Sequence, residues 1–359
     1  MRSLAELFTL KSPPLIGLDL SASSVKMVEL TRVSRGELCL EAYAIEPLPR
    51  DVVADGGIVN LDAATEAIKR CYKRLGSRAR HVAMAVPVAA VITKKIVCAA
   101  GLPEDELEET VQSEAIHYIP FALEEVSLDF QVLGPAPDSP ELVEVLVAAS
   151  RREKIEDRVA AAEGAGLIGL TMDVESYAMQ AAFELVRPRL PAQARDQNVL
   201  VVDIGSSMTQ VTVIRGTDAV FSREQAFGGN QINAEIQRLY GLSLEEAETA
   251  KKGGGLPSGY HTEVMEPFMQ NAALEIQRAL QFFFSASEYN RIDHIVLSGG
   301  CATIQGLETV VASRTRIATL VANPFAKMQI ASKLQLKRLV ADAPALMIAC
   351  GLALRRFDA

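Results

Sequence analysis

The fold is decided by Leu15-Ile-Gly-Leu-Asp-Leu-Ser-Ala-Ser-Ser24 and, further along the chain, by Val199-Leu-Val-Val-Asp-Ile-Gly-Ser-Ser-Met208. When Asp203 is placed on Asp19, each stretch is an apolar run, an Asp, a turn of small residues and the start of a returning strand. Only the two Asp residues and Ser23/Ser207 are identical, so the repeat rests on pattern. The copies lie 203 − 19 = 184 residues apart. They predict two related lobes that face each other.

The composition limits the possible classes of function. The chain has 359 residues and a net charge of −9, with 36 Lys and Arg against 45 Asp and Glu. That balance argues against an electrostatic grip on nucleic acid, and the length predicts about two domains. No charge-free run approaches the roughly 20 apolar residues of a membrane-spanning helix, and charges at Arg2, Glu6 and Lys11 interrupt the segment where a signal peptide needs an apolar region. We therefore expect a cytoplasmic protein without a membrane span.

The cysteines are odd in number and lack CxxC spacing, which favours buried thiols over disulfides or zinc ligands. They are Cys39, Cys71, Cys98, Cys301 and Cys350.

Hydrophobic periodicity predicts that both halves begin alike, with three strands followed by helices. The expected strands are 15–20, 26–31 and 37–45 in the first half and 198–203, 209–215 and 218–223 in the second. The expected helices are 61–75, and then 230–240, 244–251 and 263–287. Residues 84 to about 155 differ, because strand-like runs there surround an acidic helix that begins at Pro103. They predict a small α+β unit inserted into a larger α/β one.

The small-residue turns suggest an anion site. Ser, Ala and Gly leave backbone N–H groups uncovered and let a phosphate approach closely. An Asp beside each turn would repel a triphosphate unless a divalent cation, held through waters, lies between them. Two facing Asp-turns therefore predict Mg-nucleotide in a cleft. The alternative, that Asp19 and Asp203 only stabilise tight β-turns, is favoured for one copy alone but not for the pair.

A third turn, Ser298-Gly-Gly-Cys-Ala302, follows the apolar run 292–297 and precedes a helix expected near Ile304. Its glycines would let a ribose or a flat heterocycle lie on bare backbone. The three turns, in this order and spacing, resemble the two phosphate motifs and the adenosine motif of the superfamily of actin, heat-shock chaperones and sugar kinases.

A closer resemblance covers nearly the whole chain. Tyr118-Ile-Pro-Phe121, Asp129-Phe-Gln-Val-Leu133 and Val147-Ala-Ala-Ser-Arg151 resemble the PilM family of type IV pilus assembly proteins, as do Ala322-Asn-Pro-Phe325 and Gly351-Leu-Ala-Leu-Arg355. That family is similar to the division protein FtsA. The resemblance implies an α/β, actin-like (ribonuclease H-like) duplicated two-lobe fold with an FtsA-type inserted α+β subdomain.

The resemblance also implies domain boundaries. The first lobe would comprise residues 1–83 and 156–190, the latter with its connecting helix, and the inserted subdomain residues 84–155. The second lobe would comprise residues 191–340, and a C-terminal helix at 341–359 would return to the first.

Carried over residue by residue, the resemblance implies a binding site for ATP or ADP with Mg²⁺. The first phosphate loop would be Asp19, Ser21, Ala22, Ser23 and Ser24; the second Asp203, Gly205, Ser206, Ser207 and Thr209; and the adenosine loop Ser298, Gly299, Gly300 and Cys301. Asp19 and Asp203 would hold Mg²⁺, through water. Many superfamily members have Gly where this chain has Ser21, which implies a looser hold on phosphate.

Five further positions have competing explanations. Glu175 could orient an attacking water or simply stabilise a helix start. Glu248 and Lys251 could touch adenine and ribose or lie on an exposed helix face, and Lys26 could reach a phosphate or point to solvent. The segment Phe227-Gly228-Gly229-Asn230 could border the nucleotide or provide a helix N-cap.

Other motif matches are discounted. Gly164-Ala-Gly-Leu-Ile-Gly169 fits GxGxxG, but it follows a helix and precedes a strand, the reverse of a dinucleotide fold. The chain has no Gly-Lys pair and therefore no P-loop, and its four histidines lack metal-ligand spacing.

The PilM resemblance implies an ATP-binding scaffold at the cytoplasmic face of the inner membrane that captures the N-terminal cytoplasmic peptide of PilN. The peptide would lie in a groove between the first lobe and the inserted subdomain. Other inner-membrane pilus assembly proteins and self-association are further expected partners. An FtsA-like filament-forming membrane tether is the alternative, although no C-terminal amphipathic helix is evident, and a small-molecule kinase lacks a second constellation for its substrate. Leu4, Leu7, Phe8 and Leu10 are expected to dock on a partner or a neighbouring subunit; membrane contact is the alternative, but so few apolar residues bind a membrane weakly.

Overall fold

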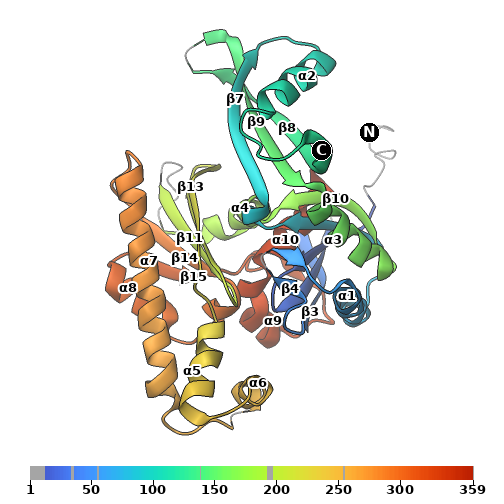
Figure 1. Ribbon diagram of the computed structural model, residues 1–359. Helices are drawn as coiled ribbons and strands as arrows, with labels where there is room; N and C mark the ends of the chain where they lie inside the picture. The colour runs from blue at the N-terminus through green and yellow to red at the C-terminus, as the bar shows by residue number, and fades with distance from the viewer. Residues whose placement is uncertain are drawn as a thin grey trace, which may run out of the picture.

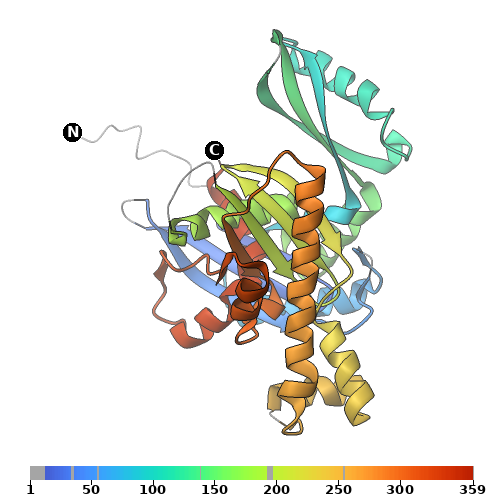
Figure 2. The same ribbon diagram turned by 90° about the vertical axis from the view of Figure 1, so that its left-hand side faces the viewer.

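The computed structural model describes residues 13–33, 36–54, 56–137, 139–191, 197–253 and 255–358. Their strands form two large sheets, one small sheet and a two-stranded ribbon of β4 (Val53–Ala54) and β5 (Gly57–Ile58). The small sheet projects from one end of the molecule, and the long helix α7 (Glu266–Ala286) flanks the opposite lobe (Figures 1 and 2). The expected apolar docking face at Leu4, Leu7, Phe8 and Leu10 lies outside the described residues.

The first large sheet has the strand order β10-β6-β1-β2-β3-β16. Its strands are β1 (Leu15–Leu20), β2 (Ser24–Arg32), β3 (Leu38–Pro47), β6 (His81–Val86), β10 (Ile168–Val174) and β16 (Gln329–Ile330). One face packs on α1 (Leu61–Leu75) and α3 (Arg152–Gly164) in a single apolar core. The α1 helix begins after Asn60, whose side chain accepts the Ala63 N–H, and ends at Gly76 in the left-handed conformation.

The second large sheet has the order β13-β12-β11-β14-β15. Its strands are β11 (Asn198–Ile204), β12 (Thr209–Arg215), β13 (Asp218–Gln225), β14 (His294–Ser298) and β15 (Ala318–Val321). One face packs on α5 (Asn230–Tyr240), α7 and α8 (Leu307–Thr315), and α6 (Leu244–Gly253) lies beside α5. Each large sheet thus starts with an antiparallel meander joined to parallel strands, as the repeat predicts.

A shared core joins the two large sheets. It buries side chains of β1 and β2, of β11 and β14, and of the helices α4 (Glu175–Val186) and α10 (Met347–Leu354). The two helices cross closely at Gly351, where a Cβ would lie 1.8 Å from the Ala178 carbonyl oxygen. Gly17 allows an equally close approach of α10 to β1, since a Cβ there would lie 2.0 Å from the Ala349 carbonyl oxygen. The short helices α9 (Leu336–Asp342) and η7 (Ala343–Leu346) lead into α10.

The inserted unit is a three-stranded antiparallel sheet of order β7-β9-β8. Its strands are β7 (Val91–Ala99), β8 (Val126–Ala136) and β9 (Ser139–Arg151). The acidic helix α2 (Glu104–Ala115) covers one face through Leu107 and Val111, which pack on Val145 and Val147. This small core is separate from the cores of the two lobes.

Two expected helices differ from the structure. A π-helical turn, η5 (His261–Met265), precedes α7 within the segment expected as one helix from 263. After the third turn, the helix expected at Ile304 is instead a short 3₁₀ helix, η6 (Gly300–Thr303), followed by α8 from Leu307. Gly306 separates the two with a left-handed φ of 88°. The described cysteines are all buried free thiols, as expected.

Candidate functional site

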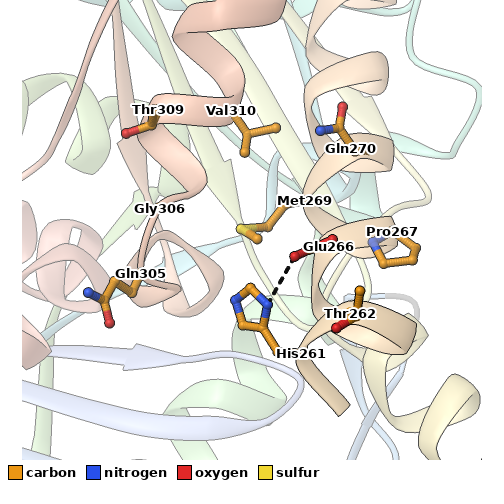
Figure 3. A pocket seen from close by; sticks show the side chains of 10 residues that line it. All are labelled: His261, Thr262, Glu266, Pro267, Met269, Gln270, Gln305, Gly306, Thr309 and Val310. Carbon is orange, nitrogen blue, oxygen red and sulfur yellow. Dashed lines mark ion pairs between the residues drawn. The ribbon is translucent and has the colours of Figure 1, made fainter. Parts of the chain in front are cut away.

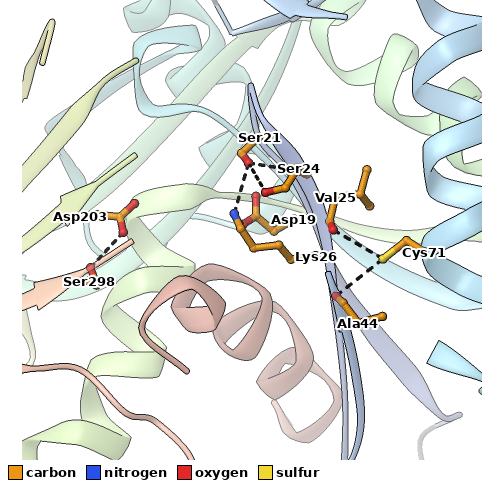
Figure 4. Close-up of polar contacts among 9 residues, drawn as sticks. All are labelled: Asp19, Ser21, Ser24, Val25, Lys26, Ala44, Cys71, Asp203 and Ser298. Carbon is orange, nitrogen blue, oxygen red and sulfur yellow. Dashed lines mark hydrogen bonds and ion pairs between the residues drawn. The ribbon is translucent and has the colours of Figure 1, made fainter. Parts of the chain in front are cut away.

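The first Asp-turn connects β1 to β2 and places a lysine directly opposite the aspartate. Asp19 is paired with Lys26 in the strand register, and the Lys26 Nζ lies 2.7 Å from Asp19 Oδ2 and 3.2 Å from Ser21 Oγ (Figure 4). Asp19 is only 3% exposed. The possibility that Lys26 points to solvent is therefore wrong, because its side chain lies in a buried ion pair.

Carboxylates set the charge of Lys26. Burial by itself lowers the pKa of Lys26, but Asp19, and beyond it Asp203 and Glu175, raise it above its ordinary value. Lys26 is therefore a fixed cation among three acidic side chains that come from both lobes and from α4. We call Asp19, Lys26, Glu175 and Asp203 the charged cluster.

The second Asp-turn connects β11 to β12 and is held by a hydroxyl from the third turn. Ser298 Oγ donates to Asp203 Oδ1 at 3.0 Å, and the Gly205 N–H donates to the Met208 carbonyl at 3.0 Å. Burial raises the pKa of Asp203, while Lys26 and the Ser298 hydrogen bond oppose the rise. Figure 4 shows Asp203 and Ser298 across from Asp19 and Lys26.

The second Asp-turn packs tightly against the segment 227–230. The Gly229 N–H donates to the Gly205 carbonyl at 3.0 Å, and the Asn230 N–H donates to the Ser206 carbonyl at 2.7 Å. A Cβ on Gly228 would lie 2.6 Å from the Ser206 carbonyl, so only glycine fits there. Asn230 is the first residue of α5 and Gly229 its N-cap. The segment therefore provides the N-cap of α5 through Gly229, as one of the two explanations predicted, and it also contacts the second Asp-turn.

The third turn lies against the same carbonyl groups. The Cys301 thiol donates to the Gly205 carbonyl at 3.3 Å, and burial raises the pKa of Cys301 to about 12, so it stays a thiol at neutral pH. Gly299 has a φ of 86°, and a Cβ there would lie 2.5 Å from the Ile204 carbonyl oxygen. These contacts bring Gly205, Gly229 and Cys301 together although they are far apart in the sequence.

Glu175 is the first residue of α4 and also belongs to the charged cluster. Burial, then Asp19 and Asp203, raise the pKa of Glu175 to about 8, although Arg158 and Lys26 oppose the rise. At pH 7 its carboxyl is therefore mostly protonated, and it can donate as well as accept a hydrogen bond. Glu175 therefore both begins α4 and places an acidic group near the two Asp-turns, so the two explanations offered for it do not exclude each other.

Glu248 and Lys251 form an ion pair on α6, with Lys251 Nζ 3.0 Å from Glu248 Oε1. Asn233 Nδ2 also donates to that oxygen at 2.6 Å. The Glu248 side chain is 40% exposed, whereas that of Lys251 is 24% exposed. The charge of Lys251 lowers the pKa of the Cys301 thiol, against the larger effect of burial.

The turns themselves can receive an anion. The N–H groups of Ala22, Ser23, Ser206 and Ser207 have no hydrogen-bond partner among the described residues, and such groups accept an anionic ligand readily. Within the described ranges no group of three or more His, Cys, Asp and Glu side chains could hold a metal ion. A divalent cation there would need waters or ligand oxygens in addition to Asp19 and Asp203.

Two residues of the site were not predicted from the sequence. Arg158 on α3 is 2% exposed, donates to the Gly56 carbonyl at 2.9 Å, and acts on Glu175 and Asp19. Its position three and four residues before Ala161 and Ala162, which are also buried, was the available signal. Gln210 on β12 lies directly opposite Asp203 in the register and is 9% exposed. Nothing in the local sequence marked it.

A separate groove of about 850 Å³ lies between the start of α7 and α8. Its lining includes His261, Glu266, Met269, Gln305 and Thr309 (Figure 3). The lining contains none of the residues expected to bind nucleotide.

The fold and sequence were compared with known proteins. A solved PilM–PilN type IV pilus biogenesis complex contains a chain 29% identical to this one, with a TM-score of 0.80, covering 97% of this chain and 100% of that chain. EutJ, an ethanolamine utilization protein of Carboxydothermus hydrogenoformans, is 19% identical with a TM-score of 0.56, covering 95% of this chain and 89% of that one. A diol dehydratase-reactivating factor solved in nucleotide-free form is 10% identical with a TM-score of 0.54, covering 96% and 100%. The last two are similar in fold alone.

The expected actin-like two-lobe fold is confirmed by these matches. None of the helices in the described residues is both long and apolar enough to cross a membrane. A family model described as type IV pilus assembly protein PilM matches residues 17–357. The chain therefore belongs to the PilM family of type IV pilus assembly proteins.

Proposed function

We propose that this protein is a cytoplasmic, nucleotide-binding scaffold of the type IV pilus machine that binds the N-terminal cytoplasmic peptide of PilN. It associates with the inner membrane through such partners. Two parts of the molecule serve the two activities: the charged cluster with its three turns binds nucleotide, and the junction of the first lobe with the inserted unit binds the peptide.

The charged cluster carries the nucleotide half of the proposal. It combines a buried cation, Lys26, with unpartnered N–H groups on both Asp-turns, a combination suited to phosphate. Bound Mg-nucleotide supplies the free energy that favours one arrangement of the lobes. Ala22, Ser23, Ser206 and Ser207 bind phosphate through their N–H groups.

Other residues have complementary roles in the same site. Asp19 and Asp203 hold Mg²⁺ through water, and Glu175, mostly protonated at pH 7, orients a water molecule by hydrogen bonding. The backbone of Gly299 and Gly300 and the helix that carries Glu248 and Lys251 border the nucleoside.

The partner half of the proposal rests on membership of the family and on exposed apolar side chains of the inserted unit and of the edge strand β10. The similar chain was solved in a complex with PilN. Ile116 and Phe121 in the inserted unit are 61% and 38% exposed, and Ile168 and Leu170 on the edge strand β10 are 49% and 54% exposed. Exposed apolar side chains can pack against those of a peptide, and an extended peptide can pair with an edge strand such as β10.

Nucleotide and peptide affect each other in this proposal. α3 follows the inserted strand β9 directly and carries Arg158, which acts on Glu175 in the charged cluster. A change in the cluster can therefore alter the inserted unit. Coupling between two sites is typically about 1–3 kcal/mol and is reciprocal.

The test is a Mg-dependent ATP titration of the wild type, Asp203→Ala and Asp218→Ala, with single-turnover hydrolysis measured in the same samples. Asp218 is an exposed aspartate on β13 of the same lobe and serves as the charge-matched control. We expect ATP binding by the wild type and Asp218→Ala and its loss in Asp203→Ala. A PilN N-terminal peptide is then titrated with and without ATP. No nucleotide binding refutes the first half, and no peptide binding refutes the second.

A further inference from the structure

A row of polar side chains crosses the second sheet beside the charged cluster. Ser298 on β14 pairs with Asp203 on β11, Asp203 pairs with Gln210 on β12, and Gln210 pairs with Glu224 on β13. Directly paired residues place their side chains on the same face of a sheet. The next residues, Val202 and Val211, belong to the core on the opposite face. Gln210 therefore lies on the same face of the sheet as Asp203, which belongs to the charged cluster.

Gln210 has an unused hydrogen-bond donor. The residue is 9% exposed, and its Nε2 is buried without a hydrogen-bond partner among the described residues. A buried amide N–H₂ group left without a partner destabilises the folded protein. Such a donor becomes favourable when a ligand brings an acceptor, and a buried amide aimed at an anion site prefers a negatively charged oxygen.

The internal repeat independently supports the direction of this side chain. In the first lobe the residue paired with Asp19 is Lys26, and its side chain lies at the aspartate in the charged cluster. Gln210 holds the equivalent position, paired with Asp203 in the second lobe. The same hairpin geometry thus presents a cation from one lobe and a neutral donor from the other.

The strand order indicates which part of a nucleotide Gln210 would meet. The third turn, which borders the nucleoside in the proposed function, follows β14, and Asp203 is on the neighbouring strand β11. Gln210 is one strand further, on β12, about 10 Å from β14 at two strand spacings. A ligand that extends from the third turn past Asp203 reaches Gln210 with its distal phosphate.

We propose that Gln210 is the residue that distinguishes a nucleoside triphosphate from a diphosphate, by donating a hydrogen bond from Nε2 to the terminal phosphate. This inference rests on the proposed nucleotide site and names the residue that makes the site specific for a triphosphate. Gln210 is a binding residue in this role and transfers no proton.

The experiment measures binding of a non-hydrolysable ATP analogue and of ADP to the full chain by calorimetry, so that no turnover is needed. Gln210→Ala removes the donor, and Gln210→Glu replaces it with a nearly isosteric acceptor that repels phosphate. Gln225→Ala is the matched control. Gln225 is a half-buried glutamine that pairs with Thr209, the residue before Gln210, and so lies on the opposite face of the sheet from Gln210. Thermal unfolding of each variant shows whether it is folded.

We expect the dissociation constant of the ATP analogue to rise about tenfold in Gln210→Ala and further in Gln210→Glu, since a hydrogen bond to a charged group is lost. The ADP constant stays within about twofold, and Gln225→Ala leaves both unchanged. Equal weakening of ATP analogue and ADP, or no change in either, overturns the role of Gln210 while the nucleotide site stands. A wild type that binds neither nucleotide overturns the proposed site and this inference together.

Discussion

The two Asp-turns share one sequence pattern, but their Asp carboxylates are stabilised by different partners. Asp19 is neutralised within its own hairpin by Lys26 at 2.7 Å. Asp203 is instead held by the Ser298 hydroxyl at 3.0 Å, a residue 95 positions away, and the place of Lys26 is taken by the amide of Gln210. In the first turn the charge of the Asp is balanced by a lysine of the same hairpin, whereas in the second turn the Asp depends on a hydroxyl from another segment of its lobe.

Burial is the main cause of the high pKa of Glu175, and the difference between the turns adds to it. The charge of Lys26 acts on Asp19, Asp203 and Glu175, but Lys26 lies in the first lobe and forms its ion pair with Asp19. The negative charges of both Asp-turns act on Glu175 and keep it protonated at pH values where an ordinary Glu is ionised. An asymmetric pair of turns thus leaves one carboxyl able to change protonation near neutral pH.

Removal of the Lys26 charge should have the largest effect on stability. Lys26→Met leaves the 3% exposed Asp19 charged and unpaired, which costs about 3–5 kcal/mol in the free energy of unfolding. Urea denaturation at pH 7 measures this change. The control is Lys69→Met in the exposed pair with Glu66, where we expect no measurable change. The double variant Asp19→Asn, Lys26→Met should regain part of the loss, and a single variant as stable as the wild type would show that the ion pair contributes nothing.

Replacement of Glu175, which lies in the charged cluster with both Asp residues, should have the next largest effect on stability, and this effect depends on pH. Below pH 4.5 Glu175 is neutral in the folded and unfolded chain, so Glu175→Gln should change nothing. As the pH rises towards 8 the unfolded chain ionises Glu175 while the folded protein holds it neutral, so the wild type loses stability that the variant keeps.

At pH 7 the Glu175→Gln variant should therefore be more stable by about 3 kcal/mol, and by more at pH 9, because the pKa of Glu175 rises from 4.5 to about 8 on folding. Denaturation curves at pH 4, 6, 8 and 9 test the sign as well as the size. A variant that is less stable than the wild type at pH 9 would mean that the folded protein favours the ionised carboxylate.

The two Asp-turns also show how far the sequence leads. The period-2 runs and the small-residue turns identified both hairpins, because strand patterning and turn chemistry are local. The third turn was found as well, but the helix after it was placed too early, since Gly306 interrupts the chain with a left-handed conformation. The π-helical turn before α7 has no sequence signature that separates it from an ordinary first turn.

The site was harder to predict than the fold because its contacts are made between distant elements. Lys26 was expected either at phosphate or in solvent, and only the register with Asp19 excludes solvent. Arg158 reaches the charged cluster from α3, and Gln210 becomes notable only when its unpartnered Nε2 and its place opposite Asp203 are known. Pairing and burial are tertiary facts that a single sequence does not contain.

Loss of the hydroxyl that holds the second turn should have a smaller effect than loss of Lys26. Ser298 is fully buried, and Ser298→Ala removes a hydrogen bond to a charged group, which costs about 2 kcal/mol. The control is Ser285→Ala, because the Ser285 hydroxyl donates to a backbone carbonyl on the exposed side of α7. Urea midpoints at pH 7 compare the two. If Ser298→Ala costs as much as Lys26→Met, the two turns do not differ in the way described.

The smallest effects come from exchanging the residues that differ between the turns. Gly205→Ser places a Cβ 3.0 Å from the Met208 carbonyl oxygen, and Ser21→Gly removes a hydroxyl that donates to the Ser24 carbonyl at 3.0 Å and accepts from Lys26 at 3.2 Å. Each change should cost about 1 kcal/mol, the first through crowding and the second through lost hydrogen bonds. Thermal and urea unfolding of both variants measures the exchange. Because each turn is fitted to its own surroundings, neither residue should serve in the place of the other. Two neutral exchanges would instead show that Ser21 and Gly205 are interchangeable and that the turns differ only in Lys26, Gln210 and the Ser298 hydrogen bond.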